Sequence, residues 1–371
     1  MRTTSRQRTV TLAGAIAALA VLILPATGPA ESRAGGAITP PPQPNSGPGG
    51  SDYTHGDYRV SSGGSGSDAW FVFEPTKPRP KVAPVTIVMH GYFEFSGYGS
   101  QQALIEHTVR KGSIVIYPRW QTGIAEPCPG PFNIEPCMQS ARNGILGALS
   151  YLRSSKAHVQ PNLRRASYFA HSFGGIITTN LANRWRDLGI PKPRVVFLDD
   201  PHDGGFNEPN EGALDDSLAG IPSSTLFQCH SGADGVFNDP YEGTGDPTQI
   251  GQPKRDASCN SVFPKLTSIP AKNKDLVLTR TDDHGDPSLS SDHGVCSGGG
   301  TSGPGAVYGQ VDAYDWNFCW KVWDALRSCA FEGRYCRYAL GDTRKHRSMG
   351  KWSDGVPVTP LKIQDKAPIR P

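Results

Sequence analysis

The stretch "SYFAHSFGGII" (167–177) places one serine between a β-like run and a helix-like run. Residues 166–170 have the apolar pattern of a buried strand, and Ile176 and Leu181 then recur at helical spacing. Ser172 itself lies in the frame "AHSFG", which fits small-x-Ser-x-Gly. A strand, a tight turn and a helix in this order are the setting of a nucleophilic serine, provided that the rest of the chain supplies a base and an acid.

Strand-like and helix-like runs alternate along the chain on both sides of Ser172. The predicted strands are 69–75, 82–92, 113–118, 194–200, 224–230 and 275–281, and the predicted helices are 104–112, 141–155 and 313–331. Buried strands that are separated by helices imply a mostly parallel sheet with helices on both faces. The sequence therefore predicts the α/β class.

Charge argues against one class of partner. The 371 residues carry a formal net charge of only +3, and their Lys and Arg residues are scattered rather than clustered. We therefore expect no nucleic-acid binding.

The N-terminus carries the pattern of a secretory signal peptide. Arg2, Arg6 and Arg8 precede an apolar run at 10–24, and small residues follow, so we expect cleavage near Ala30. The apolar run is short for a membrane-spanning helix, although an uncleaved anchor is the alternative. We expect a secreted, extracellular protein without stable membrane insertion after cleavage.

Composition then divides the chain into four parts. Residues 1–30 are the predicted signal peptide, and residues 31–52 are rich in Pro, Gly and Ser, which is typical of a linker. Residues 53–345 contain the alternating strands and helices and form the predicted catalytic domain. Residues 346–371 are polar and interrupted by prolines, and are predicted to be a tail that wraps the surface or trails from it.

Eight cysteines are more consistent with disulfides than with a metal site. None lies in a CxxC pair, and an exported chain meets an oxidising compartment. Eight cysteines allow 105 pairings. Pairing of near neighbours gives the set Cys128–Cys137, Cys229–Cys259, Cys296–Cys319 and Cys329–Cys336.

A serine nucleophile needs donors for the oxyanion that forms during acyl transfer. The first strongly buried strand ends in His90-Gly91-Tyr92, where a glycine lets the backbone approach a substrate. The amides of Tyr92 and Phe173 are the natural pair of donors. His171 is predicted to pack within the turn rather than to act as the base.

The acid and the base are sought after the later strands, because the carboxyl ends of parallel strands meet at one edge of the sheet. Asp234 follows the strand at 224–230, and Asp200 follows the strand at 194–200. His284 lies three residues beyond the strand at 275–281, and His293 lies farther along the same loop. His284 is preferred as the base because it is nearer to the strand end.

The acidic cluster in that loop has a second interpretation. Asp282, Asp283 and Asp286 are possible calcium ligands, but they lack the spacing of a calcium loop. We therefore expect no metal and no cofactor.

The motifs "APVTIVMHGY", "GSIVIYP", "AHSFGG", "DDPHDGG", "GADGVF" and "TDDHG" together resemble a secreted α/β-hydrolase. Over residues 55–335 the chain is similar to the branch that holds cutinase-like polyester hydrolases, bacterial lipases and chlorophyllases. The resemblance implies the α/β-hydrolase fold, Ser172 as nucleophile and His284 as base. It implies Asp234 as the acid, or Asp200-Pro201 by the pattern of the chlorophyllase-like members. Ala170 replaces the first glycine of the commonest motif.

Together these residues predict a secreted serine hydrolase that cleaves carboxylic esters. The aromatic stretch "GYFEFSGYG" (91–99) favours an apolar acyl or aryl group, so the expected substrate is a small, lipid or polyester ester. We expect a monomer. The alternatives are an acyltransferase or peptidase that uses the same triad, and a non-catalytic binding protein on the same scaffold.

Overall fold

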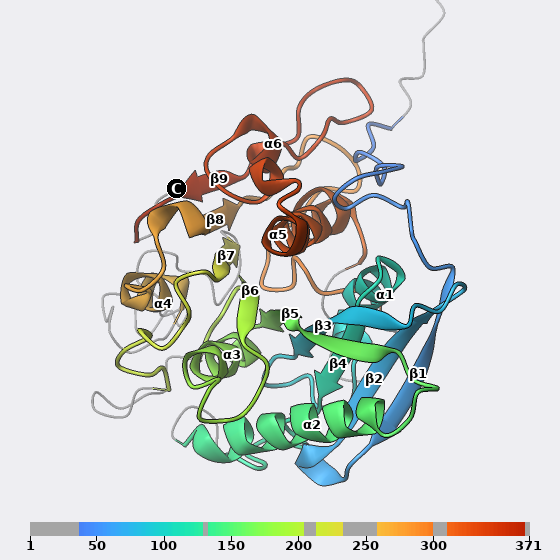
Figure 1. Cartoon of the computed structure of the whole chain (residues 1–371). Coiled ribbons are helices and arrows are strands. Elements are labelled where there is room, and N and C mark those ends of the chain that lie inside the picture. Colours follow the sequence, from blue (N-terminus) through green and yellow to red (C-terminus); the bar gives the residue numbers. More distant parts are fainter. Residues whose placement is uncertain (1–36, 129–132, 204–212, 233–257, 300–309, 368–371) are drawn as a thin grey trace, which may run out of the picture. The chain divides into compact units, whose positions relative to one another are not determined.

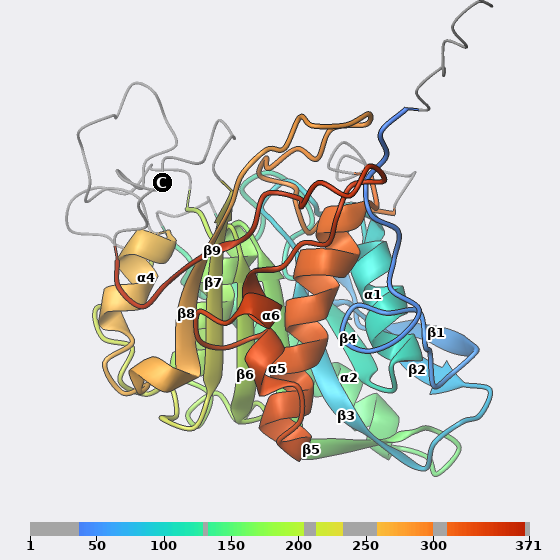
Figure 2. The same ribbon diagram turned by 90° about the horizontal axis from the view of Figure 1, so that it is seen from above.

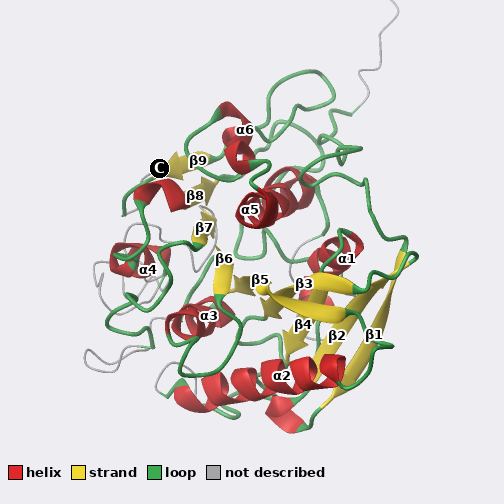
Figure 3. Cartoon of the chain, viewed as in Figure 1, coloured by secondary structure: helices red, strands yellow, loops and turns green. Residues whose placement is uncertain are grey.

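A sheet of nine strands runs through the part of the chain that the structure describes (Figures 1 and 3). This computed structural model describes residues 37–128, 133–203, 213–232, 258–299 and 310–367. The strands are β1 (Asp57–Gly63), β2 (Trp70–Thr76), β3 (Val82–Met89), β4 (Ile114–Pro118), β5 (Gln160–His171), β6 (Pro193–Asp199), β7 (Leu226–Gly232), β8 (Lys274–Thr279) and β9 (Lys362–Gln364). Their order across the sheet is β1-β2-β4-β3-β5-β6-β7-β8-β9.

The central part of this sheet is parallel. Every neighbouring pair from β4 to β8 is parallel, whereas β1, β2 and β9 pair antiparallel with their neighbours. The carboxyl ends of β3, β5, β6, β7 and β8 therefore meet at one edge. The predicted α/β class and the mostly parallel sheet are confirmed.

Helices cover both faces of the sheet (Figure 2). One face packs against α1 (Gln102–Arg110) and α5 (Trp320–Glu332), and the other packs against α2 (Glu135–Arg153), α3 (Phe173–Asn183) and α4 (Cys259–Lys265). The alternation within β4 shows how the sequence specifies the two layers. Ile114 and Ile116 pack toward the α2 side, and Val115 and Tyr117 pack toward the α5 side, because successive strand residues point to opposite faces.

Several elements differ from the predictions. Helix α2 begins at Glu135 rather than at 141, and β5 begins at Gln160 rather than at 166. The last predicted helix, 313–331, contains a π-helical turn at Asp315–Cys319 before α5. Strands β1 and β9 and helix α4 were not predicted, because their short or polar sequences lack a clear period.

Four disulfides connect elements of the domain. They join Cys128 to Cys137, Cys229 to Cys259, Cys296 to Cys319 and Cys329 to Cys336. The predicted pairing is confirmed in full. Such bonds are typical of proteins that fold in an oxidising compartment.

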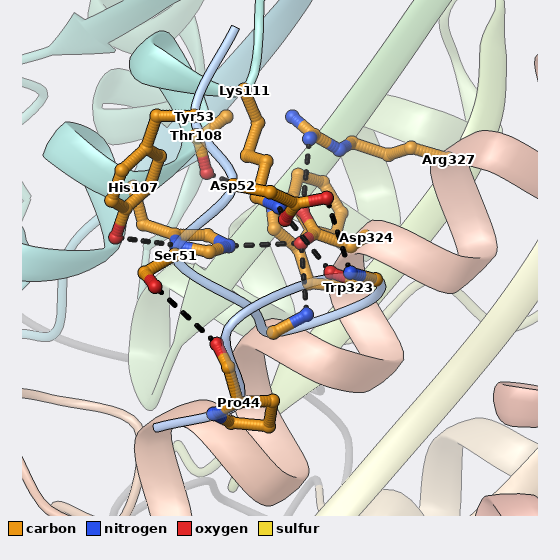
Figure 4. Close-up of polar contacts among 12 residues, drawn as sticks. Pro44, Ser51, Asp52, Tyr53, His107, Thr108, Lys111, Trp323, Asp324 and Arg327 are labelled. Atoms are coloured by element: carbon orange, nitrogen blue, oxygen red, sulfur yellow. Dashed lines mark hydrogen bonds and ion pairs between the residues drawn. The ribbon is translucent and has the colours of Figure 1, made fainter. Parts of the chain in front are cut away.

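The segment at 37–52 is built into the domain, so its interpretation as a linker is wrong over these residues. It belongs to the same compact unit as the rest of the described chain. Figure 4 shows that Asp52 of this segment pairs with Lys111, the residue that follows α1. The amide of Gly49 donates to Asp324 Oδ2 of α5 (3.0 Å). His107 Nε2 also contacts Asp324 Oδ2 (2.9 Å). The Pro- and Gly-rich composition of this segment predicted a linker, because composition does not reveal the hydrogen bonds that its main-chain groups make with the domain.

A buried carboxylate is at the centre of this network. Burial by itself raises the pKa of Asp324, but the neighbouring His107 and Arg327 lower it to about 2. Asp324 is therefore ionised and well paired, which is what a buried charge requires.

The C-terminal segment is part of the sheet rather than a trailing tail. Its strand β9 pairs antiparallel with β8, from Leu276↔Gln364 to Leu278↔Lys362. The side chain of Trp352 is buried and donates to Asp282 Oδ2 (3.3 Å). The domain therefore extends beyond the predicted boundary at 345.

The predicted signal peptide lies outside the described residues, and no helix among the described residues is long and apolar enough to cross a membrane.

Candidate active site

Ser172 occupies the sharp turn between β5 and α3, as predicted. Its φ is 53° and its ψ is −129°, a conformation that costs a non-glycine residue on the order of 1–3 kcal/mol. The turn is held because the amide of Ser172 donates to the carbonyl of Asp199 on the neighbouring strand (3.0 Å). Gly174 is required because a Cβ at this position would overlap the carbonyl oxygen of His90. This strained turn presents the serine hydroxyl at the carboxyl edge of the sheet.

The histidine at Ser172 is His293. Its Nε2 lies 2.9 Å from Ser172 Oγ, which is hydrogen-bond distance. The prediction that His284 reaches the serine is wrong. An isolated bridge between Asp282 and Leu289 closes a short loop that contains His284, and His293 follows this loop. Distance from the strand end along the sequence was therefore a poor guide to distance in space.

His284 has a different partner. Its Nε2 lies 2.8 Å from Asp354 Oδ2 in the C-terminal segment, and its ring lies 5.7 Å from the ring of Trp352. Both side chains of the His284–Asp354 pair are about one-third exposed. Like His293, His284 thus pairs with an aspartate, but with one in the C-terminal segment rather than with Asp200.

The aspartate that contacts His293 is Asp200, which follows β6 directly. Its Oδ2 lies 2.7 Å from His293 Nδ1, and the hydroxyl of Ser231 donates to its Oδ1 (3.4 Å). Asp200 has a positive φ of 45°, and its amide donates to the carbonyl of His230 (2.9 Å). Asp234, the first choice from the sequence, lies outside the described residues. The hydrogen-bonded chain in the structure is therefore Ser172–His293–Asp200.

The two amides expected to form the oxyanion hole come from neighbouring segments. Phe173 is the first residue of α3, where an amide has no acceptor within its own helix. A Cβ at Gly91 would lie 3.1 Å from Ser172 Cβ, so the turn that carries Tyr92 approaches the serine closely. The rings of Tyr92 and Phe173 also touch, with centroids 5.5 Å apart.

A buried ion pair lies beside the serine, and sequence reasoning found only half of it. His171 is packed within the turn, as predicted, and its Nδ1 lies 2.6 Å from Glu94 Oε1. Burial by itself lowers the pKa of His171, but Glu94 raises it to about 10. Burial likewise raises the pKa of Glu94, whereas His171 lowers it to about 2. Glu94 was missed because it stands among aromatic residues in a loop, without a motif of its own.

Apolar side chains are exposed next to the turn that carries Tyr92. Phe93 is 51% exposed and Ile124 is 66% exposed. The two belong to adjoining loops, because the amide of Ala125 donates to the hydroxyl of Tyr92 (3.0 Å). The neighbouring Trp120 is buried and stacks on His90 with centroids 4.6 Å apart, so it is not part of this exposed apolar surface.

One group among the described residues has three potential metal ligands within reach of one another: Asp199, His230 and Cys296. Cys296 is not available as a ligand, because its sulfur is bonded to Cys319. In the acidic cluster considered for calcium, Asp282 accepts hydrogen bonds from the amides of His284 and Thr359. The carboxylate of Asp282 therefore acts as a structural acceptor.

The candidate active site is thus a hydrogen-bonded serine, histidine and aspartate, next to an ion pair and an apolar rim. Ser172 and Asp200 lie at the carboxyl ends of β5 and β6, and His293 comes from the segment that follows β8. No protein-family model matches the sequence, and comparison with curated proteins finds no significant match.

Proposed function

We propose that this protein is a secreted serine hydrolase that cleaves carboxylic esters through an acyl-enzyme on Ser172. The observation that carries the proposal is the unbroken hydrogen-bonded chain from Ser172 Oγ through His293 to Asp200. A serine hydroxyl is a weak nucleophile until a base takes its proton and a third group orients that base. His293 is the proposed base, and Asp200 is the proposed orienting acid.

The surrounding fold supports the same reading. The strand order, with antiparallel β1 and β2 before a parallel sheet, agrees with the α/β-hydrolase fold that the motifs resemble. So does the position of Ser172, on a strained turn between a central strand and a helix. We propose that the chain has this fold.

In the first half of the reaction, Ser172 Oγ would attack the ester carbonyl carbon while its proton passes to His293 Nε2. The carbonyl oxygen becomes an oxyanion, for which the amides of Tyr92 and Phe173 are the proposed donors. Asp200 stabilises the imidazolium and keeps its ring in place. When the tetrahedral intermediate collapses, the bond to the alcohol breaks, and the departing oxygen takes the proton from Nε2.

In the second half, water replaces the alcohol. His293 Nε2 accepts a proton from water, whose oxygen attacks the acyl carbon on Ser172. Collapse of this second intermediate returns the proton to Ser172 Oγ and releases the carboxylic acid. The base therefore starts and ends each cycle neutral.

The exposed rim favours an apolar substrate. Phe93 and Ile124 are exposed to solvent next to the turn that carries Tyr92, where they could contact an acyl chain or the surface of a lipid or polyester. Four disulfides are consistent with action outside the cell.

The proposal is tested by labelling the purified, oxidised protein with a fluorophosphonate probe, which phosphonylates activated serines. We expect labelling of the wild type, loss of labelling in Ser172→Ala, and full labelling in Ser154→Ala, whose serine lies on the surface. Labelling that survives Ser172→Ala, or a folded wild type that does not label, would refute the proposal. Hydrolysis of p-nitrophenyl esters of increasing chain length then measures the acyl preference.

A further inference from the structure

The buried His171–Glu94 pair contacts two parts of the site at once. His171 Nε2 lies 2.8 Å from the carbonyl oxygen of His293, and His171 Nδ1 lies 2.6 Å from Glu94 Oε1. Glu94 in turn donates its amide to the carbonyl of Gly91 (3.2 Å), next to Tyr92. The pair therefore connects the loop that carries His293 with the turn that carries Tyr92.

The hydrogen-bond partners fix the protonation of His171. Each ring nitrogen faces an oxygen that can only accept, namely a carboxylate oxygen at Nδ1 and a main-chain carbonyl oxygen at Nε2. Both nitrogens must therefore carry a proton, which makes the ring an imidazolium. The titratable groups that face His171 are Glu94, His90, Asp199 and His293. Glu94 is the closest of them and also accepts from the hydroxyl of Ser100 (2.6 Å).

This arrangement answers a structural problem of the site. Ser172 and Asp200 are fixed by strand ends, whereas His293 lies in a long loop between β8 and the π-helical turn. Its ring is held by two side-chain contacts, but these align the ring only if its main chain is also fixed. The hydrogen bond from His171 Nε2–H to the carbonyl of His293 fixes that main chain. Because His171 is only 1% exposed, water does not compete for this bond.

We infer that His171 is a positioning residue, which Glu94 holds in place so that its Nε2–H fixes the main chain of His293 and thereby orients the base toward Ser172. This inference rests on the proposed function, because it assigns a role in that reaction. It adds two residues to the site that touch neither substrate nor the reacting atoms.

Two variants that differ only in reach test the inference. In Glu94→Gln/His171→Gln, an amide N–H can still reach the carbonyl of His293, and no buried charge is left alone. In Glu94→Gln/His171→Asn, the shorter side chain cannot reach that carbonyl. We expect the first variant to keep kcat within about fivefold of the wild type, and the second to lose about 100-fold, as small misalignments in active sites do. KM should change by less than about threefold in both, because the substrate contacts are intact.

Equal kcat values in the two variants, with both folded by near-ultraviolet circular dichroism, would overturn the inference. If the second variant does not fold, Ser100→Ala repeats the test, because it removes one hydrogen bond from Glu94. We then expect kcat to fall about threefold, in line with one hydrogen bond, and an unchanged value would overturn the inference.

A second readout does not depend on activity. An Nδ1–H that donates to a carboxylate gives a low-field proton resonance, and His293 makes such a bond to Asp200. With Ser172→Ala added to each double variant, this resonance should persist in Glu94→Gln/His171→Gln and broaden or vanish in Glu94→Gln/His171→Asn. An equal resonance in the two variants would overturn the inference. A wild type that does not label with fluorophosphonate would instead refute the proposed function alone.

Discussion

Replacing Asp200 by Asn removes one charge while keeping the shape of the site, and the structure predicts which way the new amide turns. Asp200 has a positive φ, which Asn tolerates better than most residues. The hydroxyl of Ser231 donates to Oδ1, so the amide oxygen should stay on that side and the NH₂ group should face His293 Nδ1. Nδ1 must then accept, and the single ring proton moves to Nε2.

That change of tautomer disables the base. Nε2 faces Ser172 Oγ at 2.9 Å, and once protonated it cannot take the serine proton. We expect kcat for p-nitrophenyl butyrate to fall about 10⁴-fold, the loss found for the same substitution in a known serine triad. At about 1.36 kcal/mol per tenfold change, this corresponds to about 5.4 kcal/mol of transition-state stabilisation. The rate of fluorophosphonate labelling should fall in parallel, because that reaction needs the same base.

The matched control is Asp354→Asn, which makes the same substitution in the exposed His284–Asp354 pair. It should change kcat by less than about twofold, because this pair is not part of the Ser172–His293–Asp200 chain. The fold should be unaffected as well, since partly exposed ion pairs contribute little to stability. Likewise, His293→Ala should abolish turnover and His284→Ala should not. A folded Asp200→Asn variant within tenfold of the wild type would show that another carboxylate orients the base, and Asp234→Asn would then be the variant to measure.

Three further predictions concern the framework around the site. Gly174→Ala should abolish labelling, because its Cβ meets the carbonyl of His90 at the serine turn, and wild-type labelling of this variant would contradict that explanation. Burial raises the pKa of Asp275 in the folded protein to about 7. In the unfolded chain an aspartate titrates near 4, so between about pH 4 and pH 7 the carboxyl stays protonated only when the protein is folded. The free energy of unfolding therefore falls as the pH rises through this range. Asp275→Asn should therefore raise the melting temperature more at pH 8 than at pH 5, and an equal shift at both would contradict this sign. Replacing both cysteines of the Cys229–Cys259 disulfide by serine should cost about 3.6 kcal/mol in denaturant unfolding, against about 2.4 kcal/mol for Cys329–Cys336, since these disulfides span 30 and 7 residues. Equal losses would contradict the loop-entropy account.

The parts of the fold that sequence predicts well are those set by local pattern. The strands β3 and β5 contain continuous apolar runs, and the turn at Ser172 is specified by the small residues Ala170 and Gly174, two positions before and after the serine. The four disulfides were also predictable, because each joins cysteines that are neighbours in the sequence. These features need little knowledge of how distant segments meet.

The histidine that contacts Ser172 could not be chosen in this way, because loop geometry decides which histidine lies beside the serine. The bridge from Asp282 to Leu289 diverts His284 toward Asp354, a residue 70 positions later in the chain. The segment at 37–52 was misread for a related reason. Its Pro- and Gly-rich composition hides the main-chain contacts, such as the one from Gly49 to Asp324, that attach it to the domain.

The four disulfides follow one another along the chain without overlapping, at 128–137, 229–259, 296–319 and 329–336. No loop encloses another, and none has to wait for a partner from the far end of the protein. A chain that enters an oxidising compartment from its N-terminus could thus close each bond as soon as that short segment has emerged. The observed arrangement, one of the 105 that eight cysteines allow, is the one in which each cysteine pairs with its neighbour in the order of the chain.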